Sequence, residues 1–125
     1  MKKIVFVCLG NICRSPMAEF VMKSLTDQLK IESRATSSWE HGNPIHRGTQ
    51  AIFKKYAISY DRNKTSQQIS AADFADFDYV IGMDESNVRD LKRMAPEDFQ
   101  HKIYQFEEEG VPDPWYTGDF DQTYD

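Results

Sequence analysis

The chain has 125 residues, of which 40% are hydrophobic and 28% charged, an ordinary balance for a globular protein. The net charge of −5 and the absence of a Lys/Arg block argue against a nucleic-acid partner. No apolar run reaches the roughly 18 residues that span a bilayer, so we expect no membrane partner, a cytoplasmic location and one domain over residues 1–125. Only two cysteines are present, which excludes a disulfide framework and favours functional thiols.

Short apolar runs alternate along the chain with segments whose apolar residues repeat at helical spacing. The pattern predicts strands over residues 3–8, 34–38, 78–83 and 102–106, and helices over residues 15–30, 46–56 and 84–94. Ser15 is expected to cap the first helix with Pro16 at its first position, and Asp84 to cap the last. Alternation of this kind predicts an α/β three-layer sandwich, Rossmann-like, with an open four-stranded parallel sheet and helices on both faces. Ligands of such folds bind beyond the carboxyl ends of the strands.

The segment CLGNICRS, residues 8–15, lies where the first strand gives way to the first helix. A loop of this length can point its backbone N–H groups at one anion, and the helix N-terminus adds its positive end there. Cys8 supplies a nucleophile, and Arg14 supplies a bidentate clamp for oxyanions. Gly10 and Asn11 tolerate the unusual dihedrals that turn N–H groups inward. The expected binders of phosphate or another oxyanion are Leu9, Gly10, Asn11, Ile12, Cys13, Arg14 and Ser15.

Other interpretations of the loop explain less of it. A cysteine is often a small buried side chain, but that leaves Arg14 and Ser15 unexplained. A nucleotide-binding loop lacks its lysine and second glycine here. A zinc site would depend on three scattered histidines, His41, His46 and His101, which are expected at the surface or in packing. The loop therefore predicts phosphoryl transfer through cysteine.

Thiolate attack on phosphorus needs an acid to protonate the leaving oxygen. Asp113 is the candidate, because Pro112 and Pro114 limit where its carboxyl can lie. Trp115 and Tyr116 follow and can wall a pocket for a flat ring. The alternative is an acidic surface turn followed by core aromatics.

Three blocks of the chain resemble the low-molecular-weight protein tyrosine phosphatases: residues 7–19 (VCLGNICRSPMAE), 83–87 (MDESN) and 113–116 (DPWY). They occur in that family's order and spacing, and the resemblance covers nearly the whole chain. It implies that Cys8 forms a phosphocysteine intermediate and that Arg14 binds the phosphoryl oxygens. We expect the strand order 2-1-3-4.

The resemblance also implies supporting roles. Asp113 would act first as acid and then as base for the hydrolytic water. Asn11 would hold the loop in shape with help from Ser37, and Ser15 would hydrogen-bond the sulfur. The substrate pocket would be lined by Ile12, Trp39, Trp115 and Tyr116. No metal or organic cofactor is needed, and phosphotyrosine proteins are the expected substrates.

Ile12 favours phosphotyrosine as the substrate. Relatives that act on phosphoarginine tend to carry threonine there, and a branched apolar side chain suits a phenyl ring better than a guanidinium. A phosphoarginine phosphatase and a catalytically impaired phosphate-binding module are the alternatives. The related arsenate reductases need a further cysteine pair, and no cysteine follows Cys13.

Three expectations concern the remainder of the chain. Cys13 either packs within the loop or traps oxidised Cys8 as a disulfide. The family's long C-terminal helix looks truncated, since this chain stops at Asp125, and a monomer or a weak dimer is expected. Residues 64–68 lack the His and Arg often found there, so we assign them no role in the active site.

Overall fold

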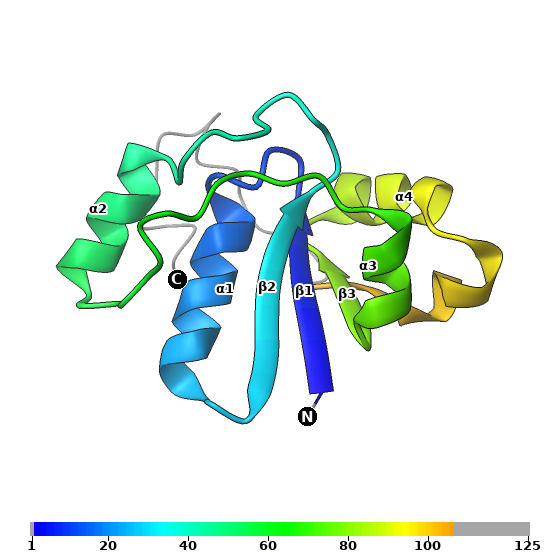
Figure 1. The fold of residues 1–125 in the computed structure, drawn as a ribbon, viewed down its shortest axis with the longest axis horizontal. Coiled ribbons are helices and arrows are strands. Elements are labelled where there is room, and N and C mark those ends of the chain that lie inside the picture. The colour runs from blue at the N-terminus through cyan, green and yellow to red at the C-terminus, as the bar shows by residue number, and fades with distance from the viewer. Residues whose placement is uncertain (1, 107–125) are drawn as a thin grey trace.

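The structure is a computed structural model that describes residues 2–106, and all structural statements below concern those residues. Strands and helices alternate along the described chain (Figure 1). The strands are β1 (Lys2–Cys8), β2 (Leu29–Ala35), β3 (Tyr79–Gly82) and β4 (Ile103–Gln105). The helices are α1 (Arg14–Leu25), α2 (Arg47–Lys55), α3 (Ala71–Asp76), α4 (Glu85–Met94) and a 3₁₀ helix (Glu97–Lys102). Among these, none has the length and apolar character needed to cross a bilayer.

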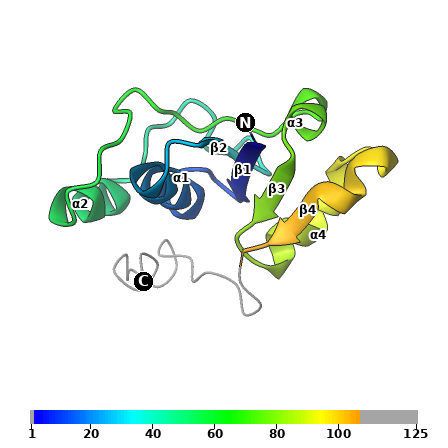
Figure 2. The same ribbon diagram turned by 90° about the horizontal axis from the view of Figure 1, so that it is seen from below.

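The strands form a parallel sheet in the order β2-β1-β3-β4, which confirms the predicted α/β architecture. Side chains of the central strand β1 alternate between the two faces of the sheet. Val5 and Val7 pack with Phe74 of α3 and Leu91 of α4, whereas Phe6 packs on the opposite face, where α1 lies. Helices therefore cover both faces, and Figure 2 shows α1 and α3 on opposite sides of the sheet.

The register brings the carboxyl ends of the strands to one edge. Cys8, the last residue of β1, pairs with Ala35 at the end of β2. On the other side of β1, Val7 pairs with Gly82 at the end of β3. The loop that follows Cys8 therefore emerges at the edge where such sheets bind ligands.

The first helix is shorter, and the second strand starts earlier, than the sequence predicted. α1 ends at Leu25 instead of residue 30, and β2 begins at Leu29 instead of residue 34. Leu29 fits the helical repeat of the residues before it, but it packs beside Ile31 in the apolar cluster of the sheet. The seven residues of β2 pair with all of β1, and this continuous ladder outweighs the local helical pattern.

The start of α1 also differs from the prediction. The helix begins at Arg14, so Cys13 is its N-cap and the assignment of Ser15 as the cap was wrong. Pro16 consequently lies at the third helical position, still within the first turn, where its missing N–H costs no helical hydrogen bond. The Ser15 hydroxyl lies near the Cys8 sulfur, so it serves the loop and not the helix end.

Two short helices were not predicted at all, namely α3 and the 3₁₀ helix. Six residues are too few to show a helical repeat, but α3 has a capping box that the sequence contains. The Ser70 side chain accepts from the Asp73 N–H, and the Asp73 carboxylate accepts from the Ser70 N–H.

Candidate active site

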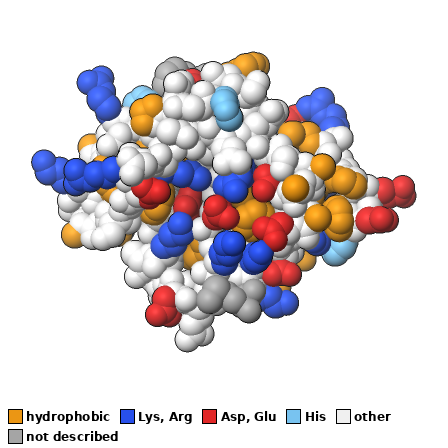
Figure 3. All heavy atoms as spheres, in the orientation of Figure 1, with side chains coloured by type: hydrophobic (Ala, Val, Ile, Leu, Met, Phe, Trp, Pro, Cys, Tyr) orange, Lys and Arg blue, Asp and Glu red, His pale blue; other side chains and the backbone are white. Residues whose placement is uncertain are grey.

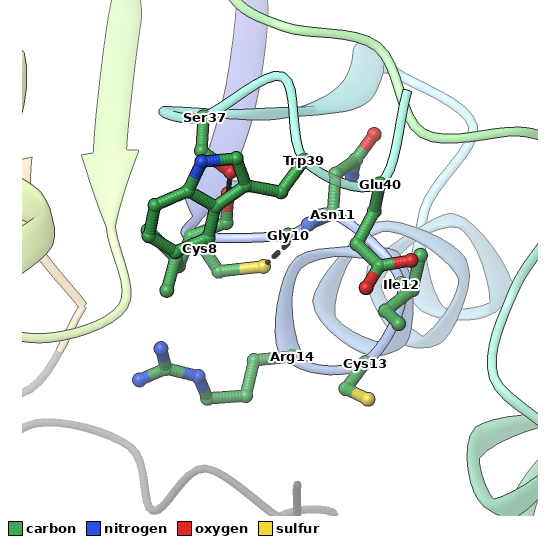
Figure 4. A pocket seen from close by; sticks show the side chains of 10 residues that line it. Cys8, Gly10, Asn11, Ile12, Cys13, Arg14, Ser37, Trp39 and Glu40 are labelled. Atoms are coloured by element: carbon green, nitrogen blue, oxygen red, sulfur yellow. Dashed lines mark hydrogen bonds between the residues drawn. The ribbon is translucent and has the colours of Figure 1, made fainter. Parts of the chain in front are cut away.

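The loop between β1 and α1 lines a hollow at the carboxyl edge of the sheet (Figure 4). Its volume is about 200 Å³, small enough to suit a phosphate group and part of a ring. The lining residues are Cys8, Leu9, Gly10, Asn11, Ile12, Cys13, Arg14, Ser37, Trp39 and Glu40. All the sequence-predicted loop residues therefore line the hollow except Ser15, which is fully buried and contacts the Cys8 sulfur.

The Cys8 sulfur lies between two hydrogen-bonding groups. The backbone N–H of Asn11 donates to Sγ at 3.2 Å, and the Ser15 hydroxyl lies 3.1 Å from Sγ. Asn11 has a φ of 57°, the left-handed conformation that turns its N–H toward the sulfur. Gly10 was also expected to adopt such a conformation. It does not: within this loop, Asn11 alone has a positive φ. The Cys8 sulfur thus accepts one backbone hydrogen bond and has a hydroxyl within hydrogen-bonding distance.

Arg14 is held by a residue that the sequence analysis treated only as a helix cap. Its side chain is 3% exposed, and Nη1 donates to Oδ2 of Asp84 at 2.6 Å. Oδ1 of the same carboxylate accepts the Asn87 N–H at 2.9 Å and thereby caps α4 as predicted. Asp84 thus joins the end of β3 to the phosphate loop. Its place in the 83–87 block of the family resemblance is the signal that could have revealed this second contact.

The charge of Asp84 is stabilised despite its partial burial. Burial raises the pKa of this carboxyl, but the hydrogen bonds from Arg14, the Asn87 N–H and the Ser86 hydroxyl lower it by more. The net result is a pKa below the ordinary value of 3.8. Asp84 is therefore an anion at neutral pH, and its attraction fixes the direction of the Arg14 guanidinium.

Side chains outside the loop hold its carbonyl groups. The Ser37 hydroxyl donates to the Leu9 carbonyl at 2.8 Å. The Ser66 hydroxyl donates to the Gly10 carbonyl at 2.7 Å. Ser66 lies within residues 64–68, a stretch to which the sequence analysis assigned no role at the site. A serine hydroxyl provides a contact there without the His or Arg that the family often has.

The walls of the hollow differ in exposure. Ile12 is buried, whereas Trp39 is 80% exposed and stands as an open aromatic surface beside the pocket. Glu40 lies across from Trp39, and its Cγ would be 3.3 Å from a Cβ placed on Gly10 (Figure 4). Glycine therefore allows the loop and the Glu40 wall to approach closely.

Cys8 and Cys13 are both buried, and no disulfide joins them. In Figure 4 the Cys13 thiol points away from the Cys8 sulfur, so a disulfide between them requires the loop to move. The predicted acid Asp113 and the predicted pocket residues Trp115 and Tyr116 lie outside the described residues, as does any C-terminal helix.

Among the described residues, no three of His, Cys, Asp and Glu are grouped so that they could hold a metal ion. His46 caps α2 by accepting the Gly48 N–H on Nδ1, and His41 and His101 are exposed. The fold and the loop together define an α/β domain whose first strand-to-helix loop forms a hollow around a cysteine and an arginine.

Comparison with known proteins places this domain in a family. The pattern of the low molecular weight phosphotyrosine protein phosphatases matches residues 3–125. A low molecular weight protein-tyrosine-phosphatase of Staphylococcus aureus, PtpA, is 45% identical over 100% of this chain and 86% of its own length. The crystal structure of a low molecular weight protein tyrosine phosphatase from Streptococcus pyogenes has a TM-score of 0.97 and is 64% identical, covering 99% of this chain and 84% of that one. The Drosophila arginine phosphatase has a TM-score of 0.86 and is 32% identical, covering 99% of this chain and 88% of its own.

The chain therefore belongs to the low molecular weight protein tyrosine phosphatases, as the sequence resemblance indicated. It is a phosphoric monoester hydrolase of the class that acts on phosphoproteins.

Proposed function

We propose that this protein hydrolyses phosphotyrosine through a phosphocysteine intermediate on Cys8. The observation that supports this most is the setting of the Cys8 sulfur, which receives the Asn11 N–H at 3.2 Å and lies 3.1 Å from the Ser15 hydroxyl. Both contacts stabilise a thiolate before attack, and the same loop can hold phosphoryl oxygens once the substrate binds.

The reaction then proceeds in two displacements. The Cys8 thiolate attacks phosphorus, and the bond to the phenolic oxygen breaks while Asp113 protonates that oxygen. Water next attacks the phosphocysteine, Asp113 takes its proton, and the S–P bond breaks to release inorganic phosphate and the thiolate. Arg14 and the N–H groups of residues 9–15 bind the three phosphoryl oxygens throughout. Inorganic phosphate and similar oxyanions are accordingly expected to be competitive ligands.

The pocket favours an aromatic leaving group. Ile12 and Trp39 line the described part of the hollow, and we propose that Trp115 and Tyr116 complete it. Phosphoarginine is the second candidate, because a relative that is 32% identical is an arginine phosphatase and because the Glu40 carboxylate at the wall could face a guanidinium.

One set of assays distinguishes these possibilities. Matched peptides bearing phosphotyrosine or phosphoarginine are compared by kcat/KM, and we expect a preference for phosphotyrosine. Cys8→Ser should abolish hydrolysis of both, and Asp113→Ala should slow an ester with a poor leaving group by about 100-fold or more. A clear preference for phosphoarginine would reject our choice of substrate. Phosphate binding without any turnover would instead identify a catalytically impaired module.

We also propose a protective role for Cys13. Peroxide oxidises the Cys8 thiolate to a sulfenic acid, the Cys13 thiol displaces water to form a disulfide, and a dithiol then reduces that disulfide. Peroxide inactivation should be reversed by dithiothreitol in the natural chain and much less in Cys13→Ser. Equal recovery of the two would dismiss the role.

The remaining proposals concern the chain as a whole. We propose one domain over residues 1–125, and a monomer or weak dimer in the cytoplasm. Two buried cysteines that form no disulfide support a reducing compartment. Sedimentation at several concentrations measures the oligomeric state directly.

A further inference from the structure

The segment of residues 64–68, here called the strap, crosses the carboxyl ends of β1 and β2 between α2 and α3 (Figure 1). Backbone hydrogen bonds fix the strap on both sides. The Ala35 N–H at the end of β2 donates to the Gln67 carbonyl at 2.8 Å. The Ser66 N–H donates to the Asn43 carbonyl at 2.8 Å, and the Gly42 N–H donates to the Ser66 carbonyl at 3.0 Å.

A buried charged group anchors the start of the strap. Lys64 Nζ donates to the Ser33 carbonyl at 3.0 Å and lies 3.3 Å from the carboxylate of Glu19, whose side chain is 3% exposed. Figure 3 shows Lys, Arg, Asp and Glu side chains gathered close together in the middle of the face seen in Figure 1. The strap is thus attached to α1 and β2 and forms a fixed support.

From this support, Ser66 reaches the peptide group that faces the nucleophile. Its hydroxyl, on a residue that is 1% exposed, donates to the Gly10 carbonyl at 2.7 Å. The Gly10 carbonyl and the Asn11 N–H belong to the same planar trans peptide, so they point in opposite directions. The opposite end of that peptide is the N–H that donates to the Cys8 sulfur at 3.2 Å. Fixing the carbonyl therefore fixes the donor.

The strap makes a second contact that leads to the same sulfur. The Gln67 N–H donates to Oδ1 of Asn11 at 3.2 Å. That amide's Nδ2 donates to the Ser15 hydroxyl at 2.8 Å, and this hydroxyl lies 3.1 Å from the Cys8 sulfur. Both hydrogen-bonding neighbours of the sulfur are thus set from the strap, one through a peptide plane and one through a side-chain amide.

We propose that Ser66 is a positioning residue for the Cys8 thiolate. It aims the Asn11 N–H at the sulfur and, by donating to the carbonyl of the same peptide, polarises that N–H and makes it a stronger donor. The consequence for the reaction rests on the proposed function of Cys8, but the effect on the thiolate does not. The charged groups that face the loop, Arg14, Asp84 and Glu40, are the same in every variant below.

Four variants isolate the hydroxyl of Ser66. Ser66→Ala removes it, and Thr65→Ala removes a hydroxyl from the neighbouring exposed position of the strap as the matched control. Threonine and valine side chains have the same shape, but only threonine has a hydroxyl. Comparing Ser66→Thr with Ser66→Val therefore separates the effect of the hydrogen bond from that of packing. Thermal unfolding confirms that each variant is folded.

Two measurements are made on each variant. The rate of Cys8 alkylation by iodoacetamide is measured against pH and gives the midpoint of thiolate formation. This measurement does not depend on phosphatase activity. All variants carry Cys13→Ser for it, so that Cys8 is the one thiol that reacts. We expect the midpoint to rise in Ser66→Ala and Ser66→Val, because the Asn11 N–H is then held less firmly toward the sulfur. The second measurement is the hydrolysis of p-nitrophenyl phosphate. In Ser66→Ala and Ser66→Val, kcat should be about 3- to 10-fold lower than in the natural chain, with a much smaller change in KM.

The outcomes are distinct. Ser66→Thr and Thr65→Ala should match the natural chain in both measurements. Equal midpoints for Ser66→Thr and Ser66→Val, or the same loss in Thr65→Ala as in Ser66→Ala, would overturn the inference. If the natural chain hydrolysed nothing, the proposed function would fail, while the alkylation midpoints would still decide the role of Ser66.

Discussion

Replacing Asp84 by asparagine tests whether one carboxylate both caps α4 and holds Arg14. Asparagine is as good an N-cap as aspartate, so the bond from the Asn87 N–H can persist. The contact with Arg14, 2.6 Å between Nη1 and Oδ2, loses its charge. The Asp84→Asn variant therefore separates the two functions of the side chain.

The expected cost follows from the geometry of this pair. Arg14 is 3% exposed and Asp84 28% exposed, so the ion pair is only weakly screened by water. Hydrogen bonds to charged groups contribute roughly 1.5–3 kcal/mol, and a value of about 2 kcal/mol suits a partner with some access to solvent. For a chain of 125 residues this corresponds to a fall in Tm of roughly 6–8 °C. A guanidinium that is no longer held in place should lower kcat/KM by about tenfold or more.

The pH dependence of stability gives a sharper test. The pKa of Asp84 is lowered in the folded state, so its contribution is complete above the ordinary value of 3.8 and disappears as the pH falls through the folded pKa. The difference in stability between the natural chain and Asp84→Asn should be constant from about pH 5 to 8 and shrink below about 3.8.

Urea unfolding and phosphatase assays across this range measure both effects. Ser86→Ala is the matched control, because it removes a hydrogen bond to the same carboxylate at 2.8 Å but keeps the charge. If Asp84→Asn kept the natural Tm and kcat/KM, or if Ser86→Ala lost as much, the carboxylate would not be what holds Arg14.

Three further predictions concern stability. Asn11→Ala should destabilise by more than Asn11→Gly, by about 1 kcal/mol in urea unfolding, because glycine accepts the φ of 57° without strain. Gly82→Ala should cost roughly 1–3 kcal/mol, since its Cβ would lie 2.9 Å from Cγ2 and 3.1 Å from the backbone nitrogen of Val88; an unchanged Tm would show that α4 can move away. Burial lowers the pKa of Lys64 below 10.5, and Glu19 only partly opposes this, so the stability contributed by this group should rise as the pH approaches 10.5. Lys64→Met should abolish that rise in urea titrations at pH 7 to 10.

The local sequence was sufficient to predict the β1–loop–α1 unit. Residues 8–15 are consecutive, so the thiol, the arginine and the N–H groups between them are brought together by any strand-to-helix turn. The parallel sheet and the position of the loop followed from the alternation of strands and helices, whereas the expected sheet order came with the family resemblance. The start of β2 could not be found in this way, because Leu29 fits a helical and a strand pattern equally well.

The chemistry that we propose for this protein therefore depends on a short stretch of sequence. Only five residues separate the proposed nucleophile Cys8 from the proposed oxyanion clamp Arg14, so the local backbone is enough to bring them together. Tertiary structure decided how that stretch is held. Asp84 is 70 positions from Arg14, and Ser66 is 56 positions from Gly10. Contacts between residues so far apart in the sequence depend on strand register and on the path of the strap. Neither can be predicted from a local pattern of residues. The same tertiary contacts determine the direction of the guanidinium and of the N–H that faces the sulfur.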